Sequence, residues 1–180
     1  MTKIEKYGIF CRSWEGGWSN HPNDKGGATM CGVTYKTFCA FRKAKGLKQP
    51  TLLDLKNISD KEWNSVLRWH TWDSMRCDDI KDEWVTYLIA DCVWMSGRGY
   101  IKRIQRILGL KDDGVVGPKT LAKMNSMSGE SLFNILWKQR EQFYKGISTG
   151  TNSVFYKGWI RRLQCVQHGY LLCNGGKKLL

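Results

Sequence analysis

The stretch from Ser13 to Thr34, SWEGGWSNHPNDKGGATMCGVT, contains the residue types that acid–base chemistry requires. Its acidic residues are Glu15 and Asp24, and Thr29 adds a hydroxyl group after two glycines. Cleavage of a glycosidic bond takes a carboxylic acid that protonates the leaving oxygen, and a second group that stabilises positive charge or activates water. Glu15 and Asp24 are candidates for this pair, and Thr29 could orient the water.

The surroundings predicted for the two carboxyl groups differ. Glu15 lies at the C-terminal end of a predicted helix, where the helix dipole is negative, and Trp14 and Trp18 flank it. Both features favour the protonated form, whereas Asp24 in a polar, glycine-rich turn is expected to stay ionised. Spacing alone also allows a plainer interpretation, in which Glu15 is solvated, Asp24 forms a turn and Thr29 is an ordinary strand residue.

These residues depend on the elements on either side of them. Helical periodicity predicts an amphipathic helix over 3–15, ended by Gly16 and Gly17, and the segment 28–34 predicts a small hairpin. Residues 82–96 are the most apolar helical segment and should form the central helix. The remaining helices are predicted at 36–45, from 59 onward, from 100 onward, in a short stretch beginning at Pro118, and at 129–147 and 154–173. The chain is therefore expected to be mainly α with one small β element.

Composition limits the class of protein and its partners. The 180 residues suffice for one domain, with or without a small lobe, that folds without metal or disulfide support. The formal net charge of +13 favours a polyanionic partner such as nucleic acid, anionic membrane or an acidic wall polymer. Because zinc-finger spacing, RNA-binding aromatic motifs and phosphate-binding glycine loops are missing from the sequence, we expect no nucleic-acid partner, no metal and no cofactor.

Two further features concern the cellular compartment. The seven cysteines include no CxxC pair, which favours free thiols in a reducing cytoplasm. The sequence has no segment with the pattern of a secretory signal or of a membrane span, so we expect no membrane insertion. A target outside the cytoplasm would then require a separate release mechanism.

The motif EGGWSNHPNDKGGATMCGVT resembles the N-terminal signature of glycoside hydrolase family 108, the phage and prophage N-acetylmuramidases. By this resemblance Glu15 matches the essential glutamate, Asp24 the family's aspartate, and Thr29 the threonine that completes the set. The later stretch LIADCVWMSGRGYIKRIQRILGLKDDGVVGPKTLAKM is similar to the family's peptidoglycan-binding type segment, with matches at Asp91, Val93, Gln105, Asp113, Gly114, Gly117, Pro118 and Thr120.

The chain departs from this pattern at two places. Cys31 stands where the family usually has an aromatic residue, and VWMSG replaces Val-Asn-x-Gly, so that Trp94 or Met95 fills the position of an asparagine. An asparagine there could hydrogen-bond the substrate or the active-site loop, and we expect an apolar replacement to lack this bond. These changes affect what the resemblance implies about the details of sugar binding.

The resemblance implies a lysozyme-like helical domain with a small β-hairpin near the N-terminus. Residues 1–95 would form the muramidase region, and residues 96–180 a peptidoglycan-binding type region packed on it. The implied activity is hydrolysis of the β-1,4 bond between N-acetylmuramic acid and N-acetylglucosamine by a monomeric endolysin, with Glu15 as general acid. Such an enzyme is made in the host cytoplasm and reaches the wall through holin-type release. Candidates for stacking on the glycan strand are Trp14, Trp18 and Trp72.

Three other functions fit parts of the sequence. A lytic transglycosylase would cleave the same bond with one glutamate and leave an anhydro sugar. An amidase or peptidase would need Cys31 or Cys11 paired with His21, and nothing in the spacing demands that pairing. A non-catalytic basic module would bind cell wall or DNA, and the DGVVGPKT loop favours wall over DNA.

Overall fold

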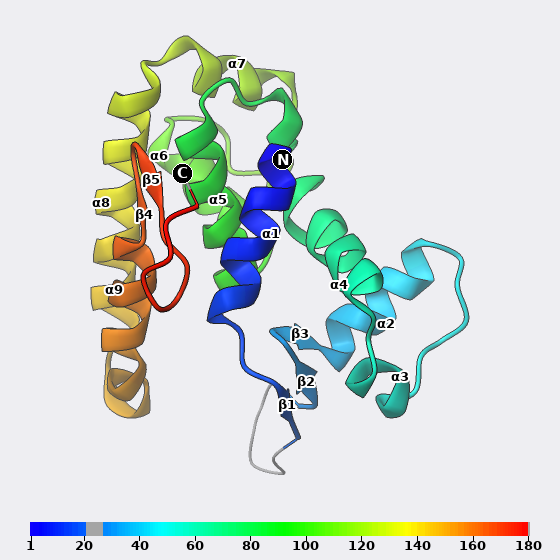
Figure 1. The fold of residues 1–180 in the computed structure, drawn as a ribbon. Coiled ribbons are helices and arrows are strands. Elements are labelled where there is room, and N and C mark those ends of the chain that lie inside the picture. The colour runs from blue at the N-terminus through cyan, green and yellow to red at the C-terminus, as the bar shows by residue number, and fades with distance from the viewer. Residues whose placement is uncertain (21–26, 180) are drawn as a thin grey trace.

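The computed structural model describes residues 1–20 and 27–179, and within them the chain is mainly α with two small antiparallel sheets (Figure 1). The helices are α1 (Lys3–Trp14), α2 (Tyr35–Ala44), α3 (Leu52–Lys56), α4 (Asp60–Leu67), α5 (Glu83–Ser96), α6 (Tyr100–Ile107), α7 (Pro118–Ser126), α8 (Gly129–Ile147) and α9 (Tyr156–Gln164). Shorter helical segments are η1 (Arg68–Trp72), η2 (Cys77–Asp79) and η3 (Gly150–Phe155). The strands are β1 (Trp18–Ser19), β2 (Thr29–Met30), β3 (Val33–Thr34), β4 (Val166–Gln167) and β5 (Tyr170–Leu171).

Helix α1 has a well-defined start and end. Thr2 and Glu5 form a capping box, in which the side chain of each accepts a hydrogen bond from the backbone N–H of the other. Glu15 is the C-terminal cap, and its extended backbone (φ −92°, ψ 139°) turns the chain away from the helix axis. The helix predicted over 3–15 buries one face, as expected, but ends at Trp14, one residue earlier, so that Glu15 is its cap.

The N-terminal sheet follows directly and has the order β1-β2-β3, with Thr29 of the middle strand opposite Ser19 and Thr34. Strands β2 and β3 are joined by Cys31 and Gly32, whose φ angles are +48° and +78°. Positive φ at both central residues is the requirement of a type I′ turn, which matches the twist of a hairpin. The hairpin predicted within 28–34 is confirmed.

Helices α2 and α3 and the continuous helix α4–η1 form the lobe that carries this sheet, on the right in Figure 1. Ser59 caps α4 by accepting a hydrogen bond from the backbone N–H of Glu62. At Arg68 the α-helix widens into the π-helical η1, and the Thr71 hydroxyl donates to the Leu67 carbonyl at 2.7 Å in this stretch. The helix predicted from residue 59 therefore continues past His70, but with a local change of helical type.

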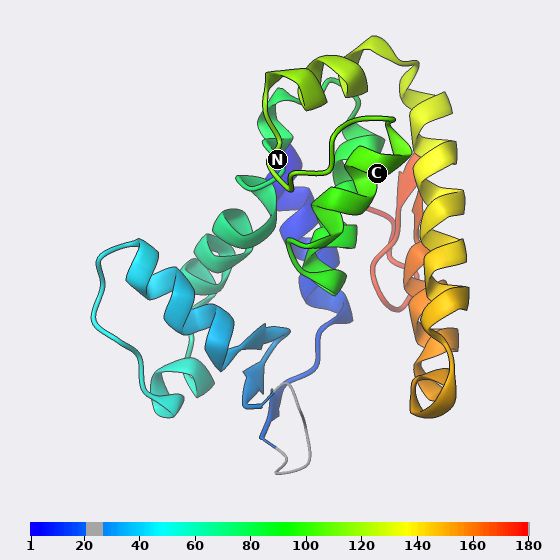
Figure 2. The same ribbon diagram turned by 180° about the vertical axis from the view of Figure 1, so that it is seen from behind.

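Helix α5 lies at the centre of the molecule, and every residue from Val85 to Val93 is buried. It packs against α8, α6, η1 and α1. Seen from behind, α8 runs the length of one side of the molecule, with α9 alongside it (Figure 2). The expectation that the most apolar segment forms the central helix is confirmed.

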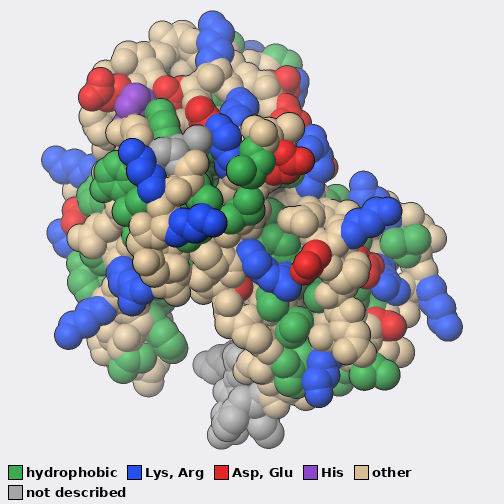
Figure 3. All heavy atoms as spheres, viewed as in Figure 1, with side chains coloured by type: hydrophobic (Ala, Val, Ile, Leu, Met, Phe, Trp, Pro, Cys, Tyr) green, Lys and Arg blue, Asp and Glu red, His purple; other side chains and the backbone are tan. Residues whose placement is uncertain are grey.

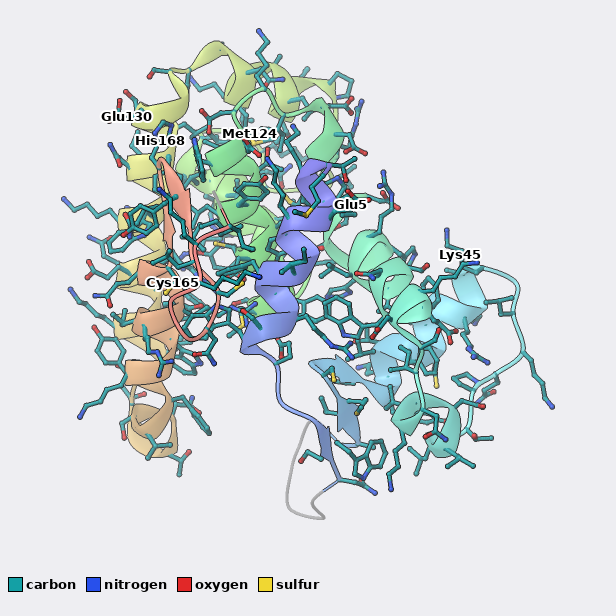
Figure 4. The ribbon with its side chains drawn as sticks, in the orientation of Figure 1. Glu5, Lys45, Met124, Glu130, Cys165 and His168 are labelled. Atoms are coloured by element: carbon teal, nitrogen blue, oxygen red, sulfur yellow. The ribbon has the colours of Figure 1, made fainter. Side chains whose placement is uncertain are left out.

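The C-terminal segment differs from the expected helix over 154–173. Helix α9 ends at Gln164, and strands β4 and β5 pair as a hairpin whose turn contains Gly169 at φ +106°. Figure 4 shows Cys165 where α9 passes into this hairpin and His168 at its far end. Val166 and Tyr170 continue the helical stripe in the sequence, yet β-branched and aromatic side chains suit a strand equally well. Helix α9 is already capped at Cys165, and the positive φ of Gly169 in the following turn lets residues 166–171 close as a hairpin at low cost.

Figure 3 shows the surface hollowed between the α8–α9 side and the lobe that carries the N-terminal sheet, with Lys and Arg side chains spread over both. Within the described residues, none of the helices combines the length and the apolar character needed to cross a membrane.

Candidate active site

Glu15 lies where α1, the N-terminal hairpin, α5 and α9 meet. Its side chain is 14% exposed, and its Oε1 accepts hydrogen bonds from Nε1 of Trp94 at 2.7 Å and from Nη1 of Arg162 at 2.9 Å. Trp94 belongs to α5 and Arg162 to α9. One carboxyl oxygen is therefore held by donors from two helices that are far away in sequence.

The second oxygen, Oε2, faces the turn between β2 and β3. A Cβ atom built on Gly32 would lie 2.6 Å from the Glu15 carboxyl carbon and 3.0 Å from Cζ2 of Trp94. The turn itself is anchored because the indole of Trp63, on α4, donates to the Cys31 carbonyl at 2.8 Å. The hairpin thus approaches Glu15 so closely that only a residue without a side chain fits at position 32.

Trp94 has a role that the sequence analysis did not predict. In place of the family's asparagine, we expected an apolar residue without a hydrogen bond, and this expectation is wrong. The indole N–H of Trp94 donates to Glu15, and its ring packs edge-on against Trp63 with centroids 5.6 Å apart. Trp94 therefore joins the acid to the helix that anchors the hairpin turn.

Arg162 and Asp91 form a buried ion pair beneath Glu15. Nε and Nη2 of Arg162 contact Asp91 Oδ1 at 3.0 and 2.8 Å, and the two side chains are 4% and 6% exposed. The sequence analysis did not identify either residue as part of the site, although the position of each in the sequence could have indicated it. Asp91 lies inside the most apolar helix, and Arg162 follows Trp159 by three residues on the apolar stripe of α9, where a charge must be paired.

The remaining predicted site residues lie as follows. Thr29 is half-buried on β2, and its hydroxyl donates to the Gly27 carbonyl at 3.1 Å, while none of the described residues donates to its oxygen. Asp24 and His21 lie outside the described residues. Thr29 stays a candidate for orienting water, and the role of Asp24 stays a prediction.

The three tryptophans proposed for sugar stacking differ in exposure. Trp14 and Trp18 are half-buried, with Arg161 placed 5.4 Å from the ring centroid of the first and Lys56 placed 5.8 Å from that of the second. Trp72 is completely buried, and its indole donates to Asp78 at 2.8 Å. Since no face of Trp72 is open to a sugar, the expectation that it stacks on the substrate is wrong, and Trp72 is a core residue.

The thiol chemistry considered as an alternative finds little support in this region. Burial raises the pKa of the Cys11 thiol far above its usual range, which disfavours the nucleophilic thiolate. Cys31 is buried in the hairpin turn. Among the described residues, no three His, Cys, Asp or Glu side chains are grouped so that they could hold a metal ion.

Comparison with known proteins gives the family of the chain. Residues 10–97 match the family Glycosyl hydrolase 108, and residues 100–164 match a family described as a predicted peptidoglycan domain. The structure is similar to that of Brucella abortus SagA, with 31% sequence identity, a TM-score of 0.76, and coverage of 91% of this chain and 90% of that chain. The chain belongs to glycosyl hydrolase family 108. Comparison with curated proteins gives no match.

Membership in family 108 confirms several of the sequence-based expectations. The fold is lysozyme-like, and the chain is a glycoside hydrolase that acts on peptidoglycan. Arg162 belongs to the segment matched to the predicted peptidoglycan domain, whereas Glu15 and Trp94 belong to the glycosyl hydrolase segment. The contacts around Glu15 therefore join both matched segments of the chain.

The bond from Trp94 to Glu15 leads to a first prediction. Trp94→Phe keeps an aromatic ring but removes the N–H donor, and a typical hydrogen bond contributes about 0.5–1.5 kcal/mol. We expect wall-lysis activity to fall by up to about tenfold, measured as clearing of turbid sacculi, with a small change in thermal midpoint. Trp84→Phe on the same helix is the control, and an equal effect of both substitutions would count against this role of Trp94.

Proposed function

We propose that the chain is an endolysin-type N-acetylmuramidase that hydrolyses the β-1,4 bond between N-acetylmuramic acid and N-acetylglucosamine, with Glu15 as general acid. The observation that carries this proposal is the asymmetric setting of the Glu15 carboxyl group. Oε1 is fixed by Trp94 and Arg162, while Oε2 lies at the hairpin turn. A carboxyl group held by one oxygen presents the other in a defined direction, which proton donation requires.

In this mechanism Oε2 of Glu15 gives its proton to the glycosidic oxygen as the bond to the anomeric carbon breaks. Asp24 stabilises the positive charge that develops on the sugar ring or directs the incoming water. The Thr29 hydroxyl oxygen accepts a hydrogen bond from that water, since its own hydrogen is engaged by Gly27. Water then adds to the anomeric carbon and loses a proton, and the starting state is restored when Glu15 regains a proton, either from this water directly or from solvent after Asp24 has taken the proton of the water.

The charge and the thiols are consistent with the proposed setting. A net charge of +13 attracts the enzyme to an anionic wall and membrane, and retains it on an insoluble substrate. The seven cysteines are free thiols, which suits synthesis in a reducing cytoplasm. We therefore propose that the protein is made in the cytoplasm of a bacterial host, reaches the wall through holin-type release and acts as a monomer.

The reaction products test this proposal against a lytic transglycosylase. A muramidase adds water, so we expect released muropeptides to end in reducing N-acetylmuramic acid, identified by mass spectrometry after digestion of purified sacculi. A transglycosylase leaves an anhydro sugar, which is lighter by one water. A digest in which the anhydro form dominates would reject hydrolysis, and products cut at the peptide bonds would reject a glycosidase altogether.

A further inference from the structure

A row of stacked aromatic side chains runs from the interior of the molecule to its surface, across α8 and the start of α9. The ring centroids of Tyr144 and Trp159 are 5.4 Å apart with 18° between the ring planes, and those of Trp159 and Phe155 are 6.0 Å apart with 28° between the planes. Tyr144, at the inner end, is 3% exposed, whereas Phe155, at the outer end, is 56% exposed. Phe155 therefore has an aromatic neighbour on one side of its ring and is open to solvent on the other.

Arg140, on α8, fixes the inner end of this row. Its guanidinium carbon lies 4.2 Å from the ring centroid of Tyr144, and Nη2 donates to the Tyr144 hydroxyl at 2.8 Å. Nη1 of Arg140 donates to the Ser96 hydroxyl at 2.9 Å, at the C-terminal end of α5. Because α5 also carries Trp94, the aromatic row is attached to the helix that holds Glu15 in place.

The outer end of the row lies on the same helix face as the contact to the acid. Phe155, Trp159 and Arg162 follow one another at steps of four and three residues, so they share one face of this helical stretch. Arg162 contacts Glu15 at 2.9 Å, and Phe155 is seven residues away, about 10 Å along the helix axis. Figure 3 shows hydrophobic side chains at the lower end of the α8–α9 side, next to the hollow, and the exposed residues Val154 and Phe155 belong to this end.

We propose that the open side of the Phe155 ring stacks on a sugar ring of the peptidoglycan glycan strand, away from the bond that is cleaved. The C–H groups on one face of a sugar ring form a flat apolar surface, which an aromatic ring covers well. Because the Phe155 ring is already held against Trp159, little conformational entropy is lost when a ligand binds. The whole row belongs to residues 100–164, the segment matched to the predicted peptidoglycan domain. This inference rests on the proposed function, since it takes Glu15 as the point from which the strand runs along α9.

The setting of Phe155 favours a glycan strand over an anionic membrane. In the described segment 148–164, the exposed large apolar residues are Val154 and Phe155, which is a small area for insertion into a bilayer. The contact with Trp159 also fixes the plane of the Phe155 ring. A fixed plane suits a flat ligand such as a sugar ring, whereas a bilayer makes no use of it.

The test measures the binding of long, peptide-free glycan strands by isothermal titration calorimetry, with the full-length Glu15→Gln protein as parent so that the strands stay intact. Phe155→Ala in this parent should weaken binding roughly three- to tenfold, the scale of one aromatic contact. Phe155→Tyr keeps the flat ring and should bind as the parent does. Val154→Ala is the control, because this side chain is 75% exposed but lies outside the stacked row, and its loss should leave the affinity unchanged.

The same ratios are expected in kcat/KM for variants with Glu15 intact, which keeps the test available if binding is too weak for calorimetry. Equal affinity of Phe155→Ala and its parent would overturn the proposal, and so would an equal loss in Phe155→Ala and Val154→Ala. Vesicles of anionic phospholipid form the second arm, and vesicle binding that depends on both residues while glycan binding depends on neither would identify a membrane contact instead. Shortening of the strands by the Glu15→Gln protein would reject Glu15 as the acid, so a failure of the proposed function is distinguishable from a failure of this inference.

Discussion

Replacing Glu15 with glutamine should abolish wall lysis while leaving the fold intact. Glutamine keeps a carbonyl oxygen that accepts from Trp94 and Arg162, but it has no proton to give to the glycosidic oxygen. General acid–base catalysis contributes roughly 100- to 10,000-fold, so the loss of activity should be of that order. Zymography on murein, with wild-type and variant protein in adjacent lanes, measures it.

The thermal midpoint of unfolding distinguishes a loss of catalysis from a loss of the fold. Glutamine is nearly the same shape as protonated glutamate, and Arg162 keeps Asp91 as its counterion, so unfolding should occur at almost the wild-type temperature. Glu141→Gln, which removes a carboxylate paired with Lys145 on the surface of α8, is the control and should retain full activity. Lysis by Glu15→Gln at the control's rate would reject Glu15 as the acid.

Much of the helical framework is predictable from local sequence. Ser59 caps the start of α4, and Pro118 occupies the first turn of α7, at the two positions where the sequence predicts a helix to begin. The wrong prediction of a helix beyond Gln164 also has a local origin, because the apolar stripe of α9 continues into residues that form strands. Periodicity identifies an apolar stripe, but it does not distinguish the helix from the hairpin that follows, whose turn contains Gly169 at positive φ.

The site is only partly predictable, for a different reason. Glu15 and Thr29 lie within one short motif, so their types and spacing are visible together. Asp91 and Arg162 are 71 residues apart and meet only because α5 and α9 both pack beneath the end of α1. Trp94 shows the same limit, since a tryptophan in an apolar helix is expected to be a core residue, whereas its indole N–H donates a hydrogen bond to Glu15. Contacts across distant helices depend on the packing of the whole fold.

Gly32→Ala should inactivate the enzyme, although it changes no ionisable group. The added Cβ would lie 2.6 Å from the Glu15 carboxyl carbon, so the hairpin and the acid must move apart. Misplacement of a catalytic group by about 1 Å costs on the order of 100-fold in rate. We therefore expect at least a hundredfold loss of lysis, with Glu15 still present and still protonatable. Turbidity assays on sacculi, normalised to folded protein by circular dichroism, measure the effect.

Backbone strain is a second explanation for a loss of activity in Gly32→Ala. A substitution at another glycine with positive φ distinguishes strain from the close approach to Glu15. Gly32 has φ +78°, and an alanine there costs about 1–2 kcal/mol from the left-handed backbone alone. Gly46 has φ +66° but no atom within 4 Å of a built Cβ, so Gly46→Ala carries the same strain without touching Glu15. Both variants should unfold at lower temperature, and only Gly32→Ala should lose activity. Equal activity in the two variants would mean that the hairpin turn can withdraw from Glu15, and the close fit at residue 32 would then have no part in directing Oε2.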